Sequence, residues 1–171
     1  VVRSSIKVAG DTFDDAIIRY VRNKYKIMIG EKTAEELKVK VGSAFRGSSD
    51  EKASIKGRNL ITGLPDEVSI SSAEINEALK DSVTQIVDNV KLVLEKTPPE
   101  LAADIIEKGI LMTGGGALLR NLDKLIEHET GVYVEVASNA VEAVAEGTGN
   151  VLSYLDKIHE SMEDRQISLV E

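Results

Sequence analysis

A run of three glycines directly after a short apolar segment is the feature that most constrains the fold of this chain. Residues 110–113 predict a buried strand, Gly114–Gly116 follow at once, and residues 117–129 carry leucine and isoleucine at helical spacing. Residues 132–136 predict another strand. Two strands and a helix joined by such short connections are typical of an α/β unit with parallel strands and a right-handed crossover. Ligands of open α/β sheets bind beyond the carboxyl ends of the strands, where this glycine turn lies.

Apolar spacing and capping residues predict helices over most of the remaining chain. Asp11 and Thr33 are the expected N-caps of two of them, with Glu36 completing a capping box at Thr33. Ser71 and Glu74 form a second expected capping box at the start of the longest helix. The predicted helices run from Asp11 to about Tyr25, from Thr33 to about Val41, from Ser71 to about Leu94, from Glu100 to Lys108 and from Val141 to about His159.

Alternating apolar and polar residues predict three further strands. These are residues 1–8, 53–57 and 67–71, with a turn at residues 63–66 between the last two. Since the chain opens inside the first of them, we expect that strand to pair with residues upstream of the sequence. Residues 43–72 are therefore interpreted as a β-rich patch of a small lobe inserted into a larger α/β unit.

Composition excludes several classes of function. The 171 residues contain no cysteine, which rules out disulfide scaffolds and thiolate sites. A net charge of −8 argues against a basic face that binds nucleic acid. No segment approaches the roughly 18 apolar residues of a membrane helix. His128 and His159 both lie in polar, helical stretches, so we expect surface histidines and neither a metal site nor a Ser-His-Asp site.

The residues alone leave three interpretations of the glycine turn open. The glycines could simply allow a tight turn and close packing of helix on sheet. They could form a dinucleotide-binding Rossmann turn, with Glu135 placed to bind a ribose, although the third glycine position is occupied by Leu119. They could also seat another flat or charged ligand against bare backbone, aided by the free N–H groups of a helix N-terminus.

Residues 110–123 resemble the adenosine motif of the actin-like ATPase superfamily, and most closely that of the MreB family of bacterial actins. The resemblance extends over nearly the whole chain, in order and with similar spacing. Its other segments are Val8–Asp11 with the following helix, Ile29–Glu35, Gly57–Leu60, Gly63–Pro65 and Glu95–Leu101.

This resemblance implies the second half of an actin-like ATPase, in which two RNase H-like halves enclose ATP and Mg²⁺. Residues 1–9 and 73–171 are then expected to form the larger RNase H-like subdomain, and residues 10–72 a smaller inserted α+β subdomain. The Gly- and Asp-rich phosphate-binding hairpins and the catalytic acid of the family do not appear in this sequence. No catalytic or metal-binding residue is therefore assigned here, and we expect the chain alone not to hydrolyse ATP.

The same resemblance implies that the adenosine end of the nucleotide is held from two sides. The expected binding residues are Glu35, Glu36, Leu37 and Lys38 on a helix of the smaller subdomain, and Gly114, Gly115, Gly116, Ala117 and Leu118 at the glycine turn. Without the resemblance, Glu35 and Lys38 would be interpreted as an exposed helical pair. Asp11 and Asp14 are expected only to cap a helix and to place charge in its first turn.

For the whole protein, the resemblance implies an ATP-binding bacterial actin that self-associates into filaments and determines cell shape. Its implied partners are further copies of itself and the cell-shape and wall-synthesis machinery. Its implied location is the cytoplasm at the inner face of the membrane, attached through parts outside this sequence. The alternatives are a heat-shock chaperone or a sugar kinase of the same superfamily, and an interaction module that keeps only the fold.

Overall fold

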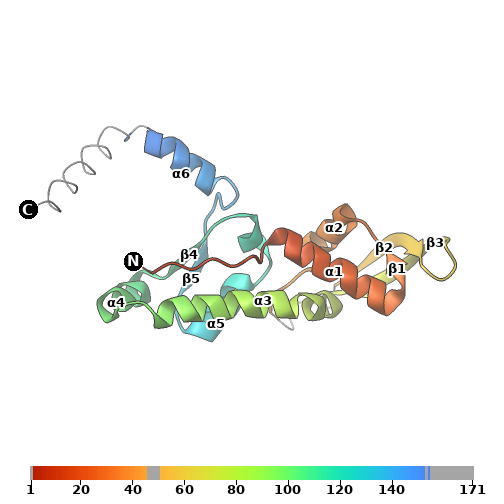
Figure 1. Ribbon diagram of the computed structural model, residues 1–171, viewed down its shortest axis with the longest axis horizontal. Helices are drawn as coiled ribbons and strands as arrows, with labels where there is room; N and C mark the ends of the chain where they lie inside the picture. Colours follow the sequence, from red (N-terminus) through yellow and green to blue (C-terminus); the bar gives the residue numbers. More distant parts are fainter. Residues whose placement is uncertain (1, 46–50, 153, 155–171) are drawn as a thin grey trace, which may run out of the picture.

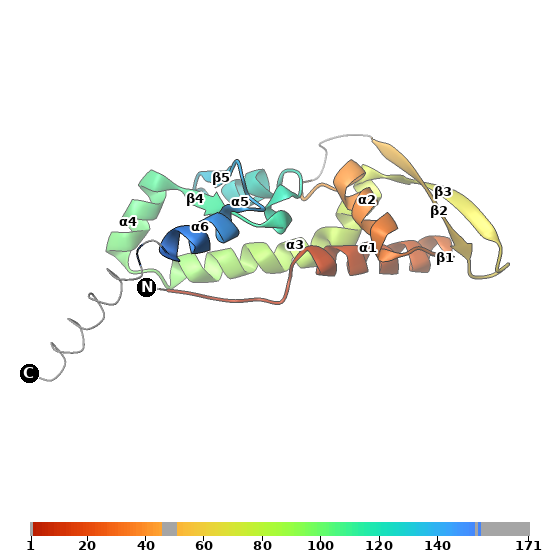
Figure 2. The same ribbon diagram turned by 90° about the horizontal axis from the view of Figure 1, so that it is seen from above.

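A computed structural model of the chain describes residues 2–45, 51–152 and 154, and one long helix joins its two lobes (Figures 1 and 2). This helix, α3, spans Ser72–Glu95. One lobe contains α1 (Gly10–Tyr25), β1 (Ile27–Met28), α2 (Glu31–Val41), β2 (Lys52–Asn59) and β3 (Pro65–Ser71). The other contains α4 (Pro99–Lys108), β4 (Ile110–Met112), the 3₁₀ helix η1 (Gly115–Leu118), α5 (Leu122–Thr130), β5 (Val134–Val136) and α6 (Ala143–Leu152).

The first lobe packs α1 and α2 with an antiparallel sheet in the order β1-β2-β3. Phe13, Ile17 and Val21 recur along one side of α1 and are almost fully buried, which confirms the predicted apolar stripe. The predicted strands and the turn between them are confirmed as β2, β3 and their hairpin. Gly57 is required in β2, because a Cβ there would lie 2.4 Å from Ile27 Cγ2 and 2.5 Å from the Met28 carbonyl oxygen.

Both predicted N-caps of this lobe are wrong. The N-cap of α1 is Ala9, so Asp11 lies inside the first turn. The N-cap of α2 is Gly30, so Thr33 also lies within its helix and forms no capping box. Both helices begin before the predicted cap, since the first intrahelical hydrogen bonds are already made to the Ala9 carbonyl by Phe13 N and to the Gly30 carbonyl by Ala34 N.

Helix α3 begins as the sequence predicts. Ser71 Oγ accepts a hydrogen bond from Glu74 N, and Glu74 Oε2 accepts one from Ser71 N at 2.9 Å, so the capping box is confirmed. Ile75 and Leu79 are fully buried along its inner side. Most buried apolar residues of both lobes belong to one continuous core, to which α3 contributes Ile75, Leu79, Val83 and Val87.

Glu74 also fixes α1 against α3. Its Oε1 atom lies 2.8 Å from Lys24 Nζ and accepts a 2.5 Å hydrogen bond from the Tyr25 hydroxyl. Burial opposes ionisation of this carboxyl, but the hydrogen bonds from Lys24, Tyr25 and Ser71 outweigh that effect and lower its pKa to about 2. The contact with Glu74 correspondingly raises the pKa of Lys24.

The second lobe contains a parallel pair of strands, as predicted, with Ile110 opposite Val134. The expectation that β4 is buried is wrong, since Leu111 is 64% exposed. The single helix predicted over residues 117–129 is also wrong. The chain forms η1, breaks at Asn121, whose φ of 59° is left-handed, and then begins α5, because a left-handed residue cannot continue a right-handed helix.

The two ends of the chain differ from expectation. Residues 2–8 are not a strand, because no described strand lies beside them to complete a ladder. Ser4 Oγ instead donates to Asn89 Oδ1 of α3 at 2.7 Å. The helix predicted from Val141 begins at Ala143 and is described to Leu152, so its expected end near His159 lies outside the described residues, as do positions 46–50 of the β-rich patch.

Candidate functional site

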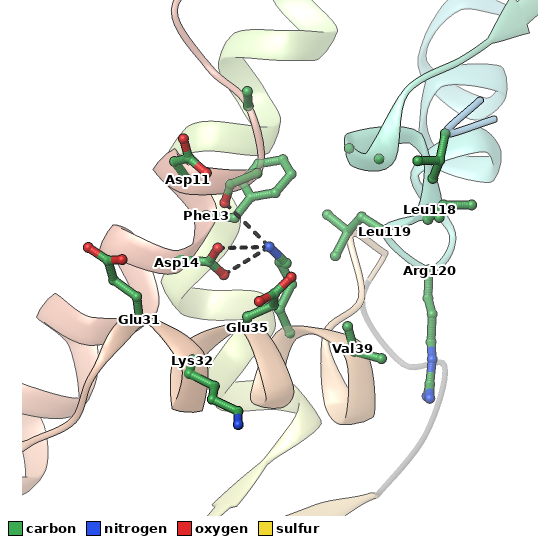
Figure 3. A pocket seen from close by; sticks show the side chains of 16 residues that line it. Asp11, Phe13, Asp14, Glu31, Lys32, Glu35, Val39, Leu118, Leu119 and Arg120 are labelled. Carbon is green, nitrogen blue, oxygen red and sulfur yellow. Dashed lines mark hydrogen bonds and ion pairs between the residues drawn. The ribbon is translucent and has the colours of Figure 1, made fainter. Parts of the chain in front are cut away.

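A cavity of about 920 Å³ lies where the two lobes face each other, and three segments form its walls (Figure 3). The first is the start of α1 with Ala9 and Gly10, the second is the side of α2 that carries Glu35 and Lys38, and the third is the glycine turn. Its size falls within the range of small-molecule sites in proteins.

Five of the nine predicted site residues line this cavity. Glu35 and Lys38 come from α2, while Gly115, Gly116 and Leu118 come from η1. Segments more than 75 residues apart in sequence therefore meet around one space, which periodicity alone could not predict.

The other four predicted residues do not line it. Leu37 is 1% exposed in the core, and with Glu36 it borders a smaller groove between α2 and β2. Ala117 is buried. Gly114 donates its N–H to the Ala140 carbonyl at 2.6 Å and has a φ of 86°, so its position supports the turn and requires glycine.

Close packing does not explain the glycines at positions 115 and 116. A Cβ added at either position would have no heavy atom within 4 Å, and neither has a positive φ. The open space beside their backbone is the cavity itself. Side-chain-free backbone at these two positions is therefore available to a flat ligand.

The ammonium of Lys38 is held by α1. It lies 2.9 Å from both carboxylate oxygens of Asp14 and 3.4 Å from the Gly10 carbonyl oxygen, to which it donates. Figure 3 shows Asp14 of α1 beside Glu35 of α2, with dashed lines marking the contacts of the Asp14 carboxylate. Asp14 was expected to contribute only first-turn charge, and no sequence pattern paired it with Lys38, because the contact depends on how α1 packs against α2.

The sequence interpretation missed several other lining residues. They are Asp11, Phe13, Glu31, Lys32, Val39 and Arg120. Val39 and Leu118 are apolar yet 67% and 58% exposed, so the cavity offers apolar surface from both α2 and the glycine turn.

The charges of the cavity favour a hydroxyl-bearing ligand over a phosphate at these walls. The lining includes four carboxylates (Asp11, Asp14, Glu31 and Glu35) and three cations (Lys32, Lys38 and Arg120), and two of those cations already pair with carboxylates. Carboxylates accept hydrogen bonds from sugar hydroxyls and repel phosphate. Within the described residues, no group of three His, Cys, Asp or Glu side chains could hold a metal ion. Nor does any described helix have the length and apolar character to cross a membrane.

The Rossmann alternative fits this geometry poorly. The glycine turn leads into a short 3₁₀ helix and a break, and α5 begins only at Leu122. Leu119, at the third glycine position, is 7% exposed and belongs to the core. The turn therefore lacks the helix N-terminus that would hold a pyrophosphate in that fold.

The chain matches a known protein family over most of its length. The model of the MreB/Mbl protein family matches residues 1–160. The cell shape-determining protein Mbl of Bacillus subtilis is 50% identical over 158 residues, which cover 92% of this chain and 47% of that protein. The cell shape-determining protein MreB of Escherichia coli is 49% identical over 156 residues, 91% and 45% of the respective lengths. The chain thus spans about half the length of these curated relatives.

Solved structures give the same result in three dimensions. MreB5 of Spiroplasma citri bound to ADP has a TM-score of 0.85 and 43% identity, over 95% of this chain and 49% of that one. The same protein bound to AMPPNP has a TM-score of 0.84. The MamK double helical filament has a TM-score of 0.67 at 17% identity, over 84% of this chain and 46% of that chain, and shows likeness of fold alone.

Proposed function

Because the chain belongs to the MreB/Mbl family, we propose that it supplies the adenosine-binding side of the nucleotide site in a cell shape-determining bacterial actin. Its fold is that of half of an actin-like protein, as the sequence predicted. The division into a larger subdomain (residues 1–9 and 73–171) and a smaller one (residues 10–72) is part of this proposal. The α3 helix then joins the two subdomains.

One observation carries the proposal: the backbone of Gly115 and Gly116 and the side chains of Glu35 and Lys38 line one cavity. Neither glycine has a side chain, and a Cβ added at either would meet no heavy atom within 4 Å, so an adenine ring can approach their backbone closely. Val39 and Leu118 offer the apolar surface that a base needs, and the Glu35 carboxylate can accept a hydrogen bond from a ribose hydroxyl. One relative of similar structure, MreB5 of Spiroplasma citri, is bound to ADP in one structure and to AMPPNP in another, which supports an adenine nucleotide as the ligand.

The phosphates and Mg²⁺ belong outside these walls in the proposed complex. The acidic lining of the cavity repels phosphate, so the polyphosphate points away from α2 toward the other half of the full-length protein. Bound Mg²⁺ would neutralise phosphate charge there. The chain described here contributes the binding and orientation of the nucleoside.

We further propose that the full-length protein self-associates into filaments and acts with the cell-shape and wall-synthesis machinery. Its proposed location is the cytoplasmic face of the membrane. The names of the curated relatives, cell shape-determining Mbl and MreB, support this role. ATP-dependent filaments of the full-length protein in electron micrographs would support it, whereas sugar-dependent ATP turnover without filaments would favour the sugar-kinase alternative.

Isothermal titration of the full-length protein with ADP tests the nucleotide proposal. The wild type is expected to bind ADP, and Glu35→Gln to bind it more weakly, since an amide accepts a ribose hydrogen bond less strongly than a carboxylate. Glu36→Gln is the matched control, because Glu36 lies outside the cavity on the same helix. Absence of ADP binding by the wild type, or equal effects of both variants, would contradict the proposal.

A further inference from the structure

We propose that Ser43, Asn76 and Asn121 form a positioning clasp that fixes the spacing between the α2 wall and the glycine-turn wall of the cavity. We call these three residues the Ser43 clasp. The inference rests on the proposed function, because it assigns the clasp an effect on nucleotide affinity. None of the three residues lines the cavity, so the clasp acts through the residues that do.

The clasp connects three segments that are distant in sequence. Ser43 follows α2, Asn121 lies between η1 and α5, and Asn76 lies in the first turns of α3. Asn121 Nδ2 donates to Ser43 Oγ at 3.1 Å, and Asn76 Nδ2 donates to the Ser43 carbonyl oxygen at 2.9 Å. Ser43 therefore receives one hydrogen bond from the glycine-turn side and one from the helix that supports both lobes.

The backbone strengthens the same junction. Ala44 N donates to the Arg120 carbonyl at 2.8 Å, and the Ser43 hydroxyl lies 3.4 Å from that same oxygen. Arg120 belongs to the cavity lining, and its neighbour Asn121 belongs to the clasp. A shift of Ser43 relative to Asn121 would thus move the segment that carries Leu118, Leu119 and Arg120 away from α2.

The chain is held tightly where it leaves α2. Gly42 N donates to the Lys38 carbonyl at 2.9 Å, and a Cβ at Gly42 would lie 2.2 Å from that oxygen. Ser43 follows α2 after a single residue, Gly42, whose position is fixed by the last turn of that helix. Ser43 of the clasp and Lys38 of the cavity wall are therefore closely connected through Gly42.

Asparagine at position 121 meets two requirements: a left-handed backbone and a side chain that can donate a hydrogen bond to Ser43. Its φ of 59° is left-handed, which asparagine tolerates better than most residues other than glycine. It occupies the N-cap position of α5, yet its side chain makes no capping hydrogen bond there. The amide is directed to Ser43 instead, so the residue joins two segments in place of capping its own helix.

Burial makes these hydrogen bonds costly to lose. Ser43 is 2% exposed, so water cannot replace a missing partner without opening the junction. Loss of one clasp hydrogen bond is expected to loosen the cavity and weaken ADP binding about five- to tenfold. Guanine carries one more exocyclic group than adenine and needs a wider space. A larger gap between the two walls should therefore weaken binding of ADP more than binding of GDP.

The test uses Asn121→Gly and Ser43→Ala in the full-length protein. Glycine keeps the left-handed backbone and removes only the amide, so Asn121→Gly carries the test if Ser43→Ala fails to fold. Ser82→Ala is the matched control, because Ser82 is also buried, at 5% exposure, in α3 but lies outside the clasp. Each variant is titrated with ADP and with GDP at a temperature equally far below its own melting temperature, so that differences in stability do not affect the comparison.

The clasp predicts a five- to tenfold loss of ADP affinity in either variant, a lower ratio of ADP to GDP affinity, and no change in Ser82→Ala. It also predicts that the double variant loses no more than Ser43→Ala alone, because Ser43→Ala already removes the contact with Asn121 together with the hydroxyl's contacts to the Phe45 and Arg120 carbonyls. Unchanged ADP affinity, or an unchanged ADP-to-GDP ratio, would overturn the clasp while leaving the nucleotide site in place. A wild type that binds no ADP would instead overturn the proposed function, and the clasp with it.

Discussion

Lys38 and Asp14 form an ion pair that joins α2 to α1 in the wall of the cavity. The ammonium lies 2.9 Å from each carboxylate oxygen, and the two side chains are only 17% and 15% exposed. Asp14 Oδ1 is buried, and no donor in the described part of the chain has hydrogen-bonding geometry toward it. The carboxylate therefore depends on this one ammonium for compensation of its charge.

Lys38→Met should destabilise the protein by about 2–3 kcal/mol, because it leaves the Asp14 carboxylate unpaired away from water. Adding Asp14→Asn should recover much of that loss, since the unpaired charge is then removed. Urea denaturation of both variants measures the free energy of unfolding. A double variant no more stable than Lys38→Met would show that the pair is not coupled.

Gly116→Ala should fold normally and bind ADP at least tenfold more weakly. The added methyl group meets no protein atom within 4 Å, yet it occupies the space assigned to the nucleotide. Gly147→Ala in α6 is the matched control, because it also adds a methyl group into open space but outside the cavity. Melting curves check the fold and titration checks the affinity. Equal ADP affinity in the two variants would place the nucleotide elsewhere.

Glu74→Gln should reduce stability at neutral pH by about 2 kcal/mol, since it weakens hydrogen bonds to Lys24 and Tyr25. The folded-state pKa of Glu74, about 2, lies below its ordinary value of 4.5. The stability from this carboxylate is therefore complete above about pH 4.5 and is lost as pH falls toward 2.

The difference in unfolding free energy between wild type and Glu74→Gln should accordingly shrink below pH 4.5. Chemical denaturation at pH 7, 4.5 and 3 measures it, with Glu95→Gln at the exposed end of α3 as the control. A difference that stays constant over this range would contradict the lowered pKa.

The 171-residue chain alone should show no ATP hydrolysis above background. Its cavity supplies groups for a nucleoside, and the family's phosphate-binding hairpins and catalytic acid do not appear in its sequence. Phosphate release is measured for the chain and for the full-length protein at equal concentration. Turnover by the chain equal to that of the full-length protein would mean that catalytic groups lie within these residues.

The sequence predicted those elements that depend on short-range interactions along the chain. The Ser71–Glu74 capping box and the apolar stripe behind it defined α3, and the glycine turn between two apolar segments indicated parallel strands. Residues 2–8 failed as a strand because alternation shows which faces a strand would have but does not provide a neighbouring strand.

In the candidate site, too, the contacts that depend on tertiary packing were not predicted. Resemblance placed Glu35 and Lys38 opposite Gly115 and Gly116, which the cavity brings together. It did not reveal that Asp14 holds Lys38, because that contact depends on how α1 packs against α2. The break at Asn121 was also missed, since leucine spacing continues through it while the backbone does not.

A crystal structure of the full-length protein with ADP tests the central claim most directly. We predict the adenine ring against the backbone of Gly115 and Gly116, with a ribose hydroxyl hydrogen-bonded to Glu35 and the phosphates directed away from α2. An ADP molecule bound elsewhere, with the cavity between α2 and η1 left empty, would contradict it.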